Sequence, residues 1–423
     1  MAANKLLEDF DLHIWSEGDR YVAQVTRSPI GPSKRAELKW PFEETHRELR
    51  LQLENAILRG RLRGSRGAVS ADEKILRDFG SSMFKAVFRE AEPIARSFNG
   101  SVDFIDTQME KFEGLRVKLN VEPPELALLP WEYVFDEASS DPTRTFLSLS
   151  SRSPLVRFLD LNAPTYAAID APLNILGMIA NPGGEWEPLD AEAERRGIEK
   201  AIDAMKDKDL VNFRWVQGET AEDLLSAMQQ DDWHVFHFIG HGGLEVFKDS
   251  DGTRRSEGYV VFADGLGGAV KISPTQLATI LQTGGHLRLA VLNCCDSGRG
   301  ASPGEALVRS GLSASVAMQF PVSNDAAVKF ASHFYGALVA GQTVERALTV
   351  GRVAMQITNA VEWGIPVLFT RAGANLSFNV KREPPRPAER AAKPVPPEPK
   401  AEHAARRQSA QAELRRLFAG VGI

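Results

Sequence analysis

Two stretches of the sequence decide the predicted fold: WHVFHFIGHGG at residues 233–243 and LAVLNCCDSG at residues 289–298. Each contains a short apolar run, which is typical of a strand buried inside a parallel sheet. His241 follows the first run directly, and Cys295 follows the second. Because α/β folds place their sites at the carboxyl ends of parallel strands, we expect both side chains at one edge of the sheet.

The same alternation of apolar runs with amphipathic helical patterns extends over residues 166–380. It predicts an α/β fold with a mainly parallel sheet that helices cover on both faces. The predicted strands are residues 174–180, 212–216, 234–239, 259–262, 288–292, 314–319 and 366–369. The predicted helices are residues 190–206, 220–229, 273–281, 304–310, 325–340 and 343–359.

Residues 1–165 predict a separate N-terminal α/β lobe. Residues 11–26 alternate apolar and polar side chains on both sides of an EGD turn, which predicts a hairpin. Helical patterns follow at about 42–61 and 71–98, and strand patterns at 115–121 and 154–161. At the other end of the chain, the Pro-, Ala- and charge-rich residues 381–407 predict an extended linker. Residues 408–423 predict a short helix or tail, either disordered or able to dock on a partner or on the protein itself.

His241 and Cys295 are the candidate catalytic pair, 54 residues apart in the sequence. A thiol with a pKa of roughly 8.5 is only slightly ionised at neutral pH, and a nearby imidazole can take its proton. Gly240, Gly242 and Gly243 let the backbone approach a substrate closely. The N–H groups of Gly242 and Cys295 are the predicted oxyanion hole, with Gly240 in a supporting role.

Several neighbouring residues have assigned or alternative roles. Cys294 is expected to be a buried core residue, and His237, inside its strand, a buried hydrogen-bonded support. Asp325 is interpreted either as a pocket acid or, preferentially, as a helix cap. Residues 245–258 form either a surface hairpin connection or a mobile flap. The residues predicted to line a substrate pocket are Asn293, Asp296, Ser323, Asn324 and Asp325.

The chain resembles the CHAT family of clan CD cysteine peptidases, which are relatives of caspases and separase. HFIGHGG resembles the histidine motif of the family and LNCCDSG its cysteine motif. The similarity extends over about residues 114–369 and includes ELALLPWEYVFD at 125–136. It implies a caspase-like fold, a His/Cys dyad, no metal or other cofactor, and an inactive caspase-like first lobe. It also implies structural roles for Pro130, Trp131, Glu132 and Arg157, while the neutral Asn293 argues against a strict preference for cleavage after Arg or Lys.

Composition excludes several other classes of protein. The net charge of -6 and pI near 5.9 argue against a nucleic-acid partner, which would need clustered cations. No apolar run approaches the roughly 20 residues that span a bilayer, and the N-terminus lacks the apolar region of a secretory signal. Two adjacent cysteines can build neither a disulfide framework nor a four-ligand zinc site. We therefore expect a cytoplasmic protein that is not inserted in a membrane.

The predicted function is a regulated cysteine endopeptidase that cleaves a partner protein. The resemblance points to a prokaryotic defence or cell-death pathway, with an activating partner that binds the C-terminal tail. The alternative is a catalytically silent caspase-like scaffold or adaptor that binds peptides. The presence of both His241 and Cys295 favours the enzyme.

Overall fold

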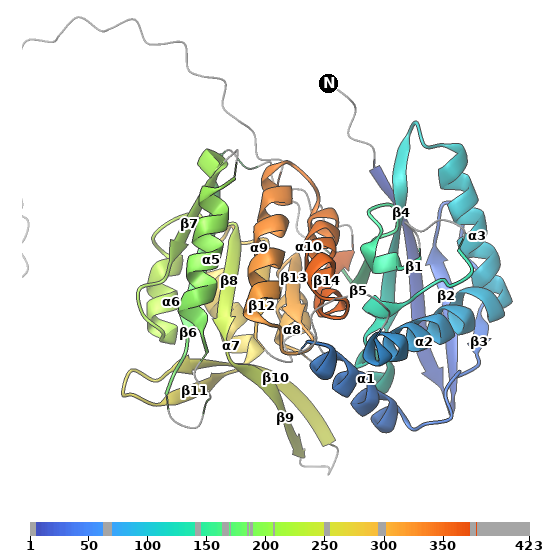
Figure 1. Ribbon diagram of the computed structural model, residues 1–423, viewed down its shortest axis with the longest axis horizontal. Coiled ribbons are helices and arrows are strands. Elements are labelled where there is room, and N and C mark those ends of the chain that lie inside the picture. The colour runs from blue at the N-terminus through green and yellow to red at the C-terminus, as the bar shows by residue number, and fades with distance from the viewer. Residues whose placement is uncertain are drawn as a thin grey trace, which may run out of the picture. The chain divides into compact units, whose positions relative to one another are not determined.

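Within the described residues, an 11-stranded sheet carries helices on both of its faces (Figure 1). The computed structural model describes residues 6–61, 70–139, 145–162, 169, 171–183, 186, 189–205, 208–248, 254–294, 302–372 and 378. The strands of this sheet are β1 (Leu6–Glu17), β2 (Arg20–Arg27), β3 (Ala36–Leu38), β4 (Phe112–Val121), β5 (Leu155–Asn162), β6 (Leu173–Ala180), β7 (Val211–Trp215), β8 (Val235–Gly240), β12 (Leu289–Asn293), β13 (Ala314–Met318) and β14 (Pro366–Ala372). Across the sheet they follow the order β3-β2-β1-β4-β5-β14-β13-β12-β8-β6-β7.

Most neighbouring strands of this sheet are parallel, which confirms the predicted fold class. β1, β4, β5 and β14 form one parallel set, and β13, β12, β8, β6 and β7 form another. The two sets meet at the antiparallel pair of β13 and β14. The direction of β14 was not expected, because an apolar run indicates burial on both faces but not the direction of the strand.

Two groups of helices cover the two faces. In β8, Val235 and Ile239 belong to the core on one face, and Phe236 and Phe238 to the core on the other. The helices of the first face are α1 (His46–Arg61), α2 (Ala71–Lys85), α3 (Glu92–Thr107), α5 (Ala191–Asp203), α9 (Asn324–Val339) and α10 (Val344–Thr358). Those of the second face are α6 (Ala221–Met228), α7 (Pro274–Gln282) and α8 (Pro303–Arg309). Helices on both faces therefore agree with the prediction.

One predicted helix, at residues 71–98, is interrupted. α2 passes into a π-helical turn, η1 (Ala86–Glu90), and α3 begins after Ala91 with Pro93 in its first turn. Proline lacks a backbone N–H and collides with the preceding turn, so it begins a helix more readily than it continues one. The apolar periodicity continues across the break, which is why the pattern alone does not reveal it.

A separate antiparallel sheet extends from the end of β8 (Figure 1). It consists of β9 (Gly242–Lys248), β10 (Arg254–Ala263) and β11 (Ala269–Ile272). The prediction that residues 259–262 form a strand of the main sheet is therefore wrong. These residues form a strand, but it is the end of β10 in the second sheet. Strands also occupy both ends of the segment 245–258, which belongs to a hairpin. A ribbon that extends past the main sheet needs no regular apolar face, so its polar sequence gave no strand signal.

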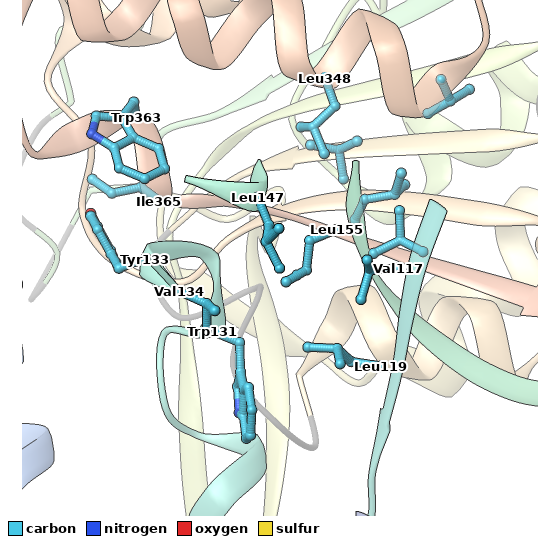
Figure 2. Close-up of a cluster of buried hydrophobic side chains, with 14 of the residues drawn as sticks. Val117, Leu119, Trp131, Tyr133, Val134, Leu147, Leu155, Leu348, Trp363 and Ile365 are labelled. Atoms are coloured by element: carbon cyan, nitrogen blue, oxygen red, sulfur yellow. The ribbon is translucent and has the colours of Figure 1, made fainter. Parts of the chain in front are cut away.

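The segment 125–136, which joins β4 to β5 in the sequence, packs into the core. Trp131 and Tyr133 of η2 (Trp131–Tyr133) are buried, and the Tyr133 ring lies 4.9 Å from that of Trp363 (Figure 2). Glu132 accepts two hydrogen bonds from Arg157, at 3.0 and 2.9 Å. Burial alone would raise the pKa of Glu132, but the Arg157 charge and hydrogen bonds lower it. These contacts agree with the structural roles that the resemblance implied.

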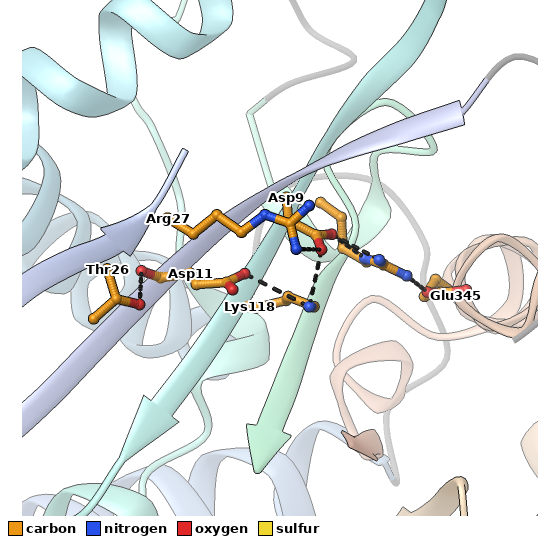
Figure 3. A network of polar contacts seen from close by, with 7 residues as sticks. Asp9, Asp11, Thr26, Arg27, Lys118 and Glu345 are labelled. Carbon is orange, nitrogen blue, oxygen red and sulfur yellow. Dashed lines mark hydrogen bonds and ion pairs between the residues drawn. The ribbon is translucent and has the colours of Figure 1, made fainter. Parts of the chain in front are cut away.

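A network of charged side chains joins β1 and β4 to α10 (Figure 3). The ammonium of Lys118 lies 3.0 Å from Asp9 and 3.6 Å from Asp11, and Arg116 bridges Asp9 and Glu345. Burial acts to raise the pKa of Asp9, but Arg116 and Lys118 lower it. Arg116 and Glu345, which lie on opposite sides of the predicted lobe boundary, thus form an ion pair.

The predicted division into lobes at residues 1–165 and 166–380 stays a prediction, since one sheet passes through both. The predicted linker at 381–407 and the tail at 408–423 lie outside the described residues.

Candidate active site

The two predicted motifs meet at one edge of the main sheet. β8 lies between β6 and β12 and is parallel to both, with Ala180 paired to Gly240 and Asn293 paired to Ile239. Gly240 has no room for a side chain, because a Cβ atom there would lie 2.9 Å from the Ala180 carbonyl oxygen. The close contact between the strand ends fixes the backbone immediately before His241.

An aromatic side chain packs against His241. Its ring lies 5.2 Å from the Trp186 ring, and Trp186 makes an edge contact with Tyr259 at 6.3 Å. His241 is half-buried, and its Nε2 atom is shielded from solvent. The imidazole is therefore packed against an aromatic ring and partly shielded from solvent.

The backbone after His241 has a defined register. The Val261 N–H donates to the His241 carbonyl at 3.0 Å, and Gly243 is paired with Tyr259 across β9 and β10. In an antiparallel pair, successive residues direct their polar backbone groups alternately toward and away from the partner strand. The N–H of Gly242 therefore points away from β10, so the ladder does not consume the predicted oxyanion donor.

The predicted nucleophile, Cys295, and the predicted pocket residue Asp296 lie outside the described residues. Cys294, the last described residue before them, is 4% exposed and belongs to the apolar core on the α6–α8 face. This burial agrees with its expected role as a core residue.

Asn293 is buried and bonded to a carboxyl group that the sequence did not suggest. Its Nδ2 donates to Oε1 of Glu194 in α5, and Glu194 is only 4% exposed. Burial raises the pKa of Glu194 to about 7, although the hydrogen bond from Asn293 acts to lower it. A carboxyl group that titrates near neutral pH thus supports the end of β12, two residues before Cys295.

His237 is the buried, hydrogen-bonded residue that was expected. Its Nδ1 shares a 2.6 Å hydrogen bond with the hydroxyl of Tyr335 in α9. Burial lowers the pKa of His237 to about 3, so its imidazole is neutral. Burial, and then the nearby Glu194 charge, raise the pKa of Tyr335. His237 and Tyr335 therefore remain uncharged, and their hydrogen bond and packing join β8 to α9.

The remaining predicted pocket residues follow β13, next to β12 in the sheet. Ser323 is the N-cap of α9, and its backbone N–H and hydroxyl donate to Glu362 at 2.7 and 2.9 Å. The preferred prediction that Asp325 caps this helix is wrong, because Ser323 takes that position. Asn324 and Asp325 are exposed in the first turn, where a carboxylate is favoured by the helix dipole.

Three residues at this edge escaped the sequence analysis: Trp186, Tyr259 and Glu194. Glu194 had a detectable signal, since it shares the buried face of α5 with Ala191 and Ile198. A carboxylate on an apolar stripe requires a partner. Trp186 and Tyr259 come from a loop and from the second sheet, and no spacing in the sequence connects them to His241.

Among the described helices, none is both long and apolar enough to cross a membrane. The described residues also contain no cluster of three or more His, Cys, Asp or Glu side chains suited to a metal ion, and the expected absence of a metal stays a prediction.

Comparisons with known proteins place the chain in a family. Two crystal structures of the Saccharomyces cerevisiae separase–securin complex, at 3.0 and 2.6 Å resolution, align with TM-scores of 0.47 and 0.42 and identities of 9% and 11%. Each alignment covers 86% of this chain but 30% of the other, so this chain spans less than a third of their length. The search of curated proteins gave no match. A family model described as the CHAT domain matches residues 106–394. Because this match covers more than half of the sequence, the chain belongs to the CHAT-domain family.

Proposed function

We propose that this protein is a cysteine endopeptidase in which His241 and Cys295 form the catalytic dyad. Family membership supports the peptidase class. The observation that best supports the dyad is the pairing of β8 with β12, in which Ile239 lies opposite Asn293. Their separation in sequence equals that of His241 and Cys295, so two further residues in the same register would bring Cys295 level with His241. Neighbouring strands lie about 4.8 Å apart, a distance that the two side chains can bridge.

The chemistry follows from these groups. His241 takes the proton of Cys295, and the thiolate attacks the scissile carbonyl carbon. The N–H groups of Gly242 and Cys295 donate to the oxyanion of the tetrahedral intermediate. The imidazolium then gives its proton to the leaving amine, and water hydrolyses the thioester with His241 again as the base. The orientation of the Gly242 N–H, away from β10, supports its part in this scheme.

The substrate is proposed to be a partner protein. Asn293, Asp296, Ser323, Asn324 and Asp325 remain the proposed pocket residues, and the bond between Asn293 and Glu194 supports a fixed pocket wall at the end of β12. The cytoplasmic location, the activating partner that binds residues 408–423 and the defence or cell-death setting stay predictions from the sequence.

A thiol-directed peptide reagent tests the dyad. The protein is incubated with a peptidyl acyloxymethyl ketone, and the modified residue is identified by peptide mass mapping. We expect labelling of Cys295, its loss in Cys295→Ala, and a strong reduction in His241→Ala. Cys294→Ala is the matched control and should retain the label, because Cys294 lies in the core.

Equal labelling of Cys294 and Cys295, or labelling that is indifferent to His241→Ala, would contradict the proposal. Labelling without cleavage of any member of a peptide library would favour the scaffold alternative.

A further inference from the structure

The strand β9 begins immediately after His241 and has an open edge. It is the last strand of its sheet, since the order is β11-β10-β9. No described strand pairs with it on the side away from β10. An edge of this kind presents unpaired N–H and C=O groups that can accept another strand.

The register identifies the backbone groups on that edge. His241 uses its carbonyl in the bond from Val261, and the ladder continues with Gly243 opposite Tyr259 and Glu245 opposite Glu257. These odd-numbered residues direct their polar groups toward β10. The intervening residues, Gly242 and Leu244, direct theirs toward the open edge.

The open edge is continuous with the proposed catalytic centre. Gly242 is both the first residue of β9 and the proposed oxyanion donor, and Leu244 lies two residues farther along the same edge. A peptide whose scissile carbonyl accepts from the Gly242 N–H would therefore lie against β9, one strand spacing from Leu244.

We propose that the polypeptide substrate binds in extended form as an additional strand on β9, with its main chain paired to Gly242 and Leu244. This inference rests on the proposed peptidase function. Main-chain pairing supplies affinity that tolerates many side chains, while pockets select alternate residues of the bound strand. The expected occupant is an extended segment of protein without proline at the paired positions, because proline cannot donate to a ladder.

The substitution Leu244→Pro tests the pairing. It removes an N–H that β10 does not use, so the hairpin loses no ladder bond. The matched control is Ala269→Pro in β11, on the opposite edge of the same sheet. Ala269 pairs with Ala263, whose N–H donates to the Glu219 carbonyl instead, so Ala269 also directs its N–H outward.

We expect Leu244→Pro to lower kcat/KM for a polypeptide substrate roughly tenfold, the effect of about one lost hydrogen bond, and Ala269→Pro to have the wild-type value. Wild-type protein should also lose a similar factor on a substrate whose N–H facing Leu244 is replaced by an ester oxygen. The ester series is made at every position within three residues of the cleaved bond, and it decides the question even if Leu244→Pro does not fold.

Equal kcat/KM for wild type and Leu244→Pro, a matching loss in Ala269→Pro, or an ester series without any sensitive position would overturn the pairing while leaving the dyad intact. Failure of the dyad is a different result: wild-type protein would then neither cleave a substrate nor react with the peptidyl ketone at Cys295, and both proposals would fall.

Discussion

Glu194→Gln should stabilise the protein at neutral and higher pH. Glu194 is buried, and its pKa is raised from 4.5 to about 7 because burial penalises the carboxylate. Glutamine keeps the shape and an oxygen acceptor for the Asn293 amide, but it cannot ionise. The substitution therefore removes a buried titrating group with little change in packing.

The sign and size follow from proton binding. Below pH 4.5 the carboxyl is neutral in both the folded and the unfolded chain. As the pH rises to about 7, the folded chain keeps a proton that the unfolded chain has lost, so the stability of the wild type falls and the loss is complete above the folded pKa. At about 1.4 kcal/mol for each tenfold difference in proton affinity, this loss amounts to about 3 kcal/mol.

Urea unfolding at pH values from 5 to 8, followed by tryptophan fluorescence, measures this effect. The free energy of unfolding of Glu194→Gln should rise relative to wild type across that range. Glu192→Gln, an exposed carboxylate in the same helix turn, is the matched control and should follow the wild-type curve. Parallel curves for wild type and Glu194→Gln would refute the burial argument.

Two further substitutions test the buried polar contacts. Glu132→Ala leaves the buried Arg157 without its carboxylate and should cost about 3–5 kcal/mol in urea unfolding, whereas Arg20→Ala, which breaks an exposed ion pair, should cost less than about 1 kcal/mol. Similar costs for the two would contradict a structural role for the buried ion pair of Glu132 and Arg157. Tyr335→Phe removes the hydroxyl bonded to His237 and should cost about 1–3 kcal/mol by the same assay; an unchanged unfolding midpoint would count against that hydrogen bond.

The main sheet could be predicted because burial leaves a clear imprint on the sequence. β8 and β12 are buried along their whole length, and each is an apolar run with one polar residue, His237 in β8 and Asn293 in β12. Strand direction leaves no such imprint, so the reversal between β13 and β14 was missed. The ribbon of β9 and β10 was predicted only in part: a hairpin connection was one of two interpretations of residues 245–258, and its polar sequence did not reveal the strands.

The sheet edge that carries the candidate site was predictable, because it lies at the ends of two apolar runs. His241 and Asn293 were located from the ends of two apolar runs, and the structure places those ends at one edge. Glu194 was overlooked because charged neighbours in AEAERR suggest an exposed helix face. Trp186 reaches His241 through a tertiary contact that periodicity cannot encode.

We propose that the imidazole of His241 ionises the thiol of Cys295. A Cys294→Ala background leaves Cys295 as the single cysteine, and its rate of alkylation by iodoacetamide can be followed from pH 5 to 10. We predict that the apparent thiol pKa lies below the ordinary value of roughly 8.5, and that His241→Ala returns it to about that value. Superimposable pH curves with and without His241 would contradict the account.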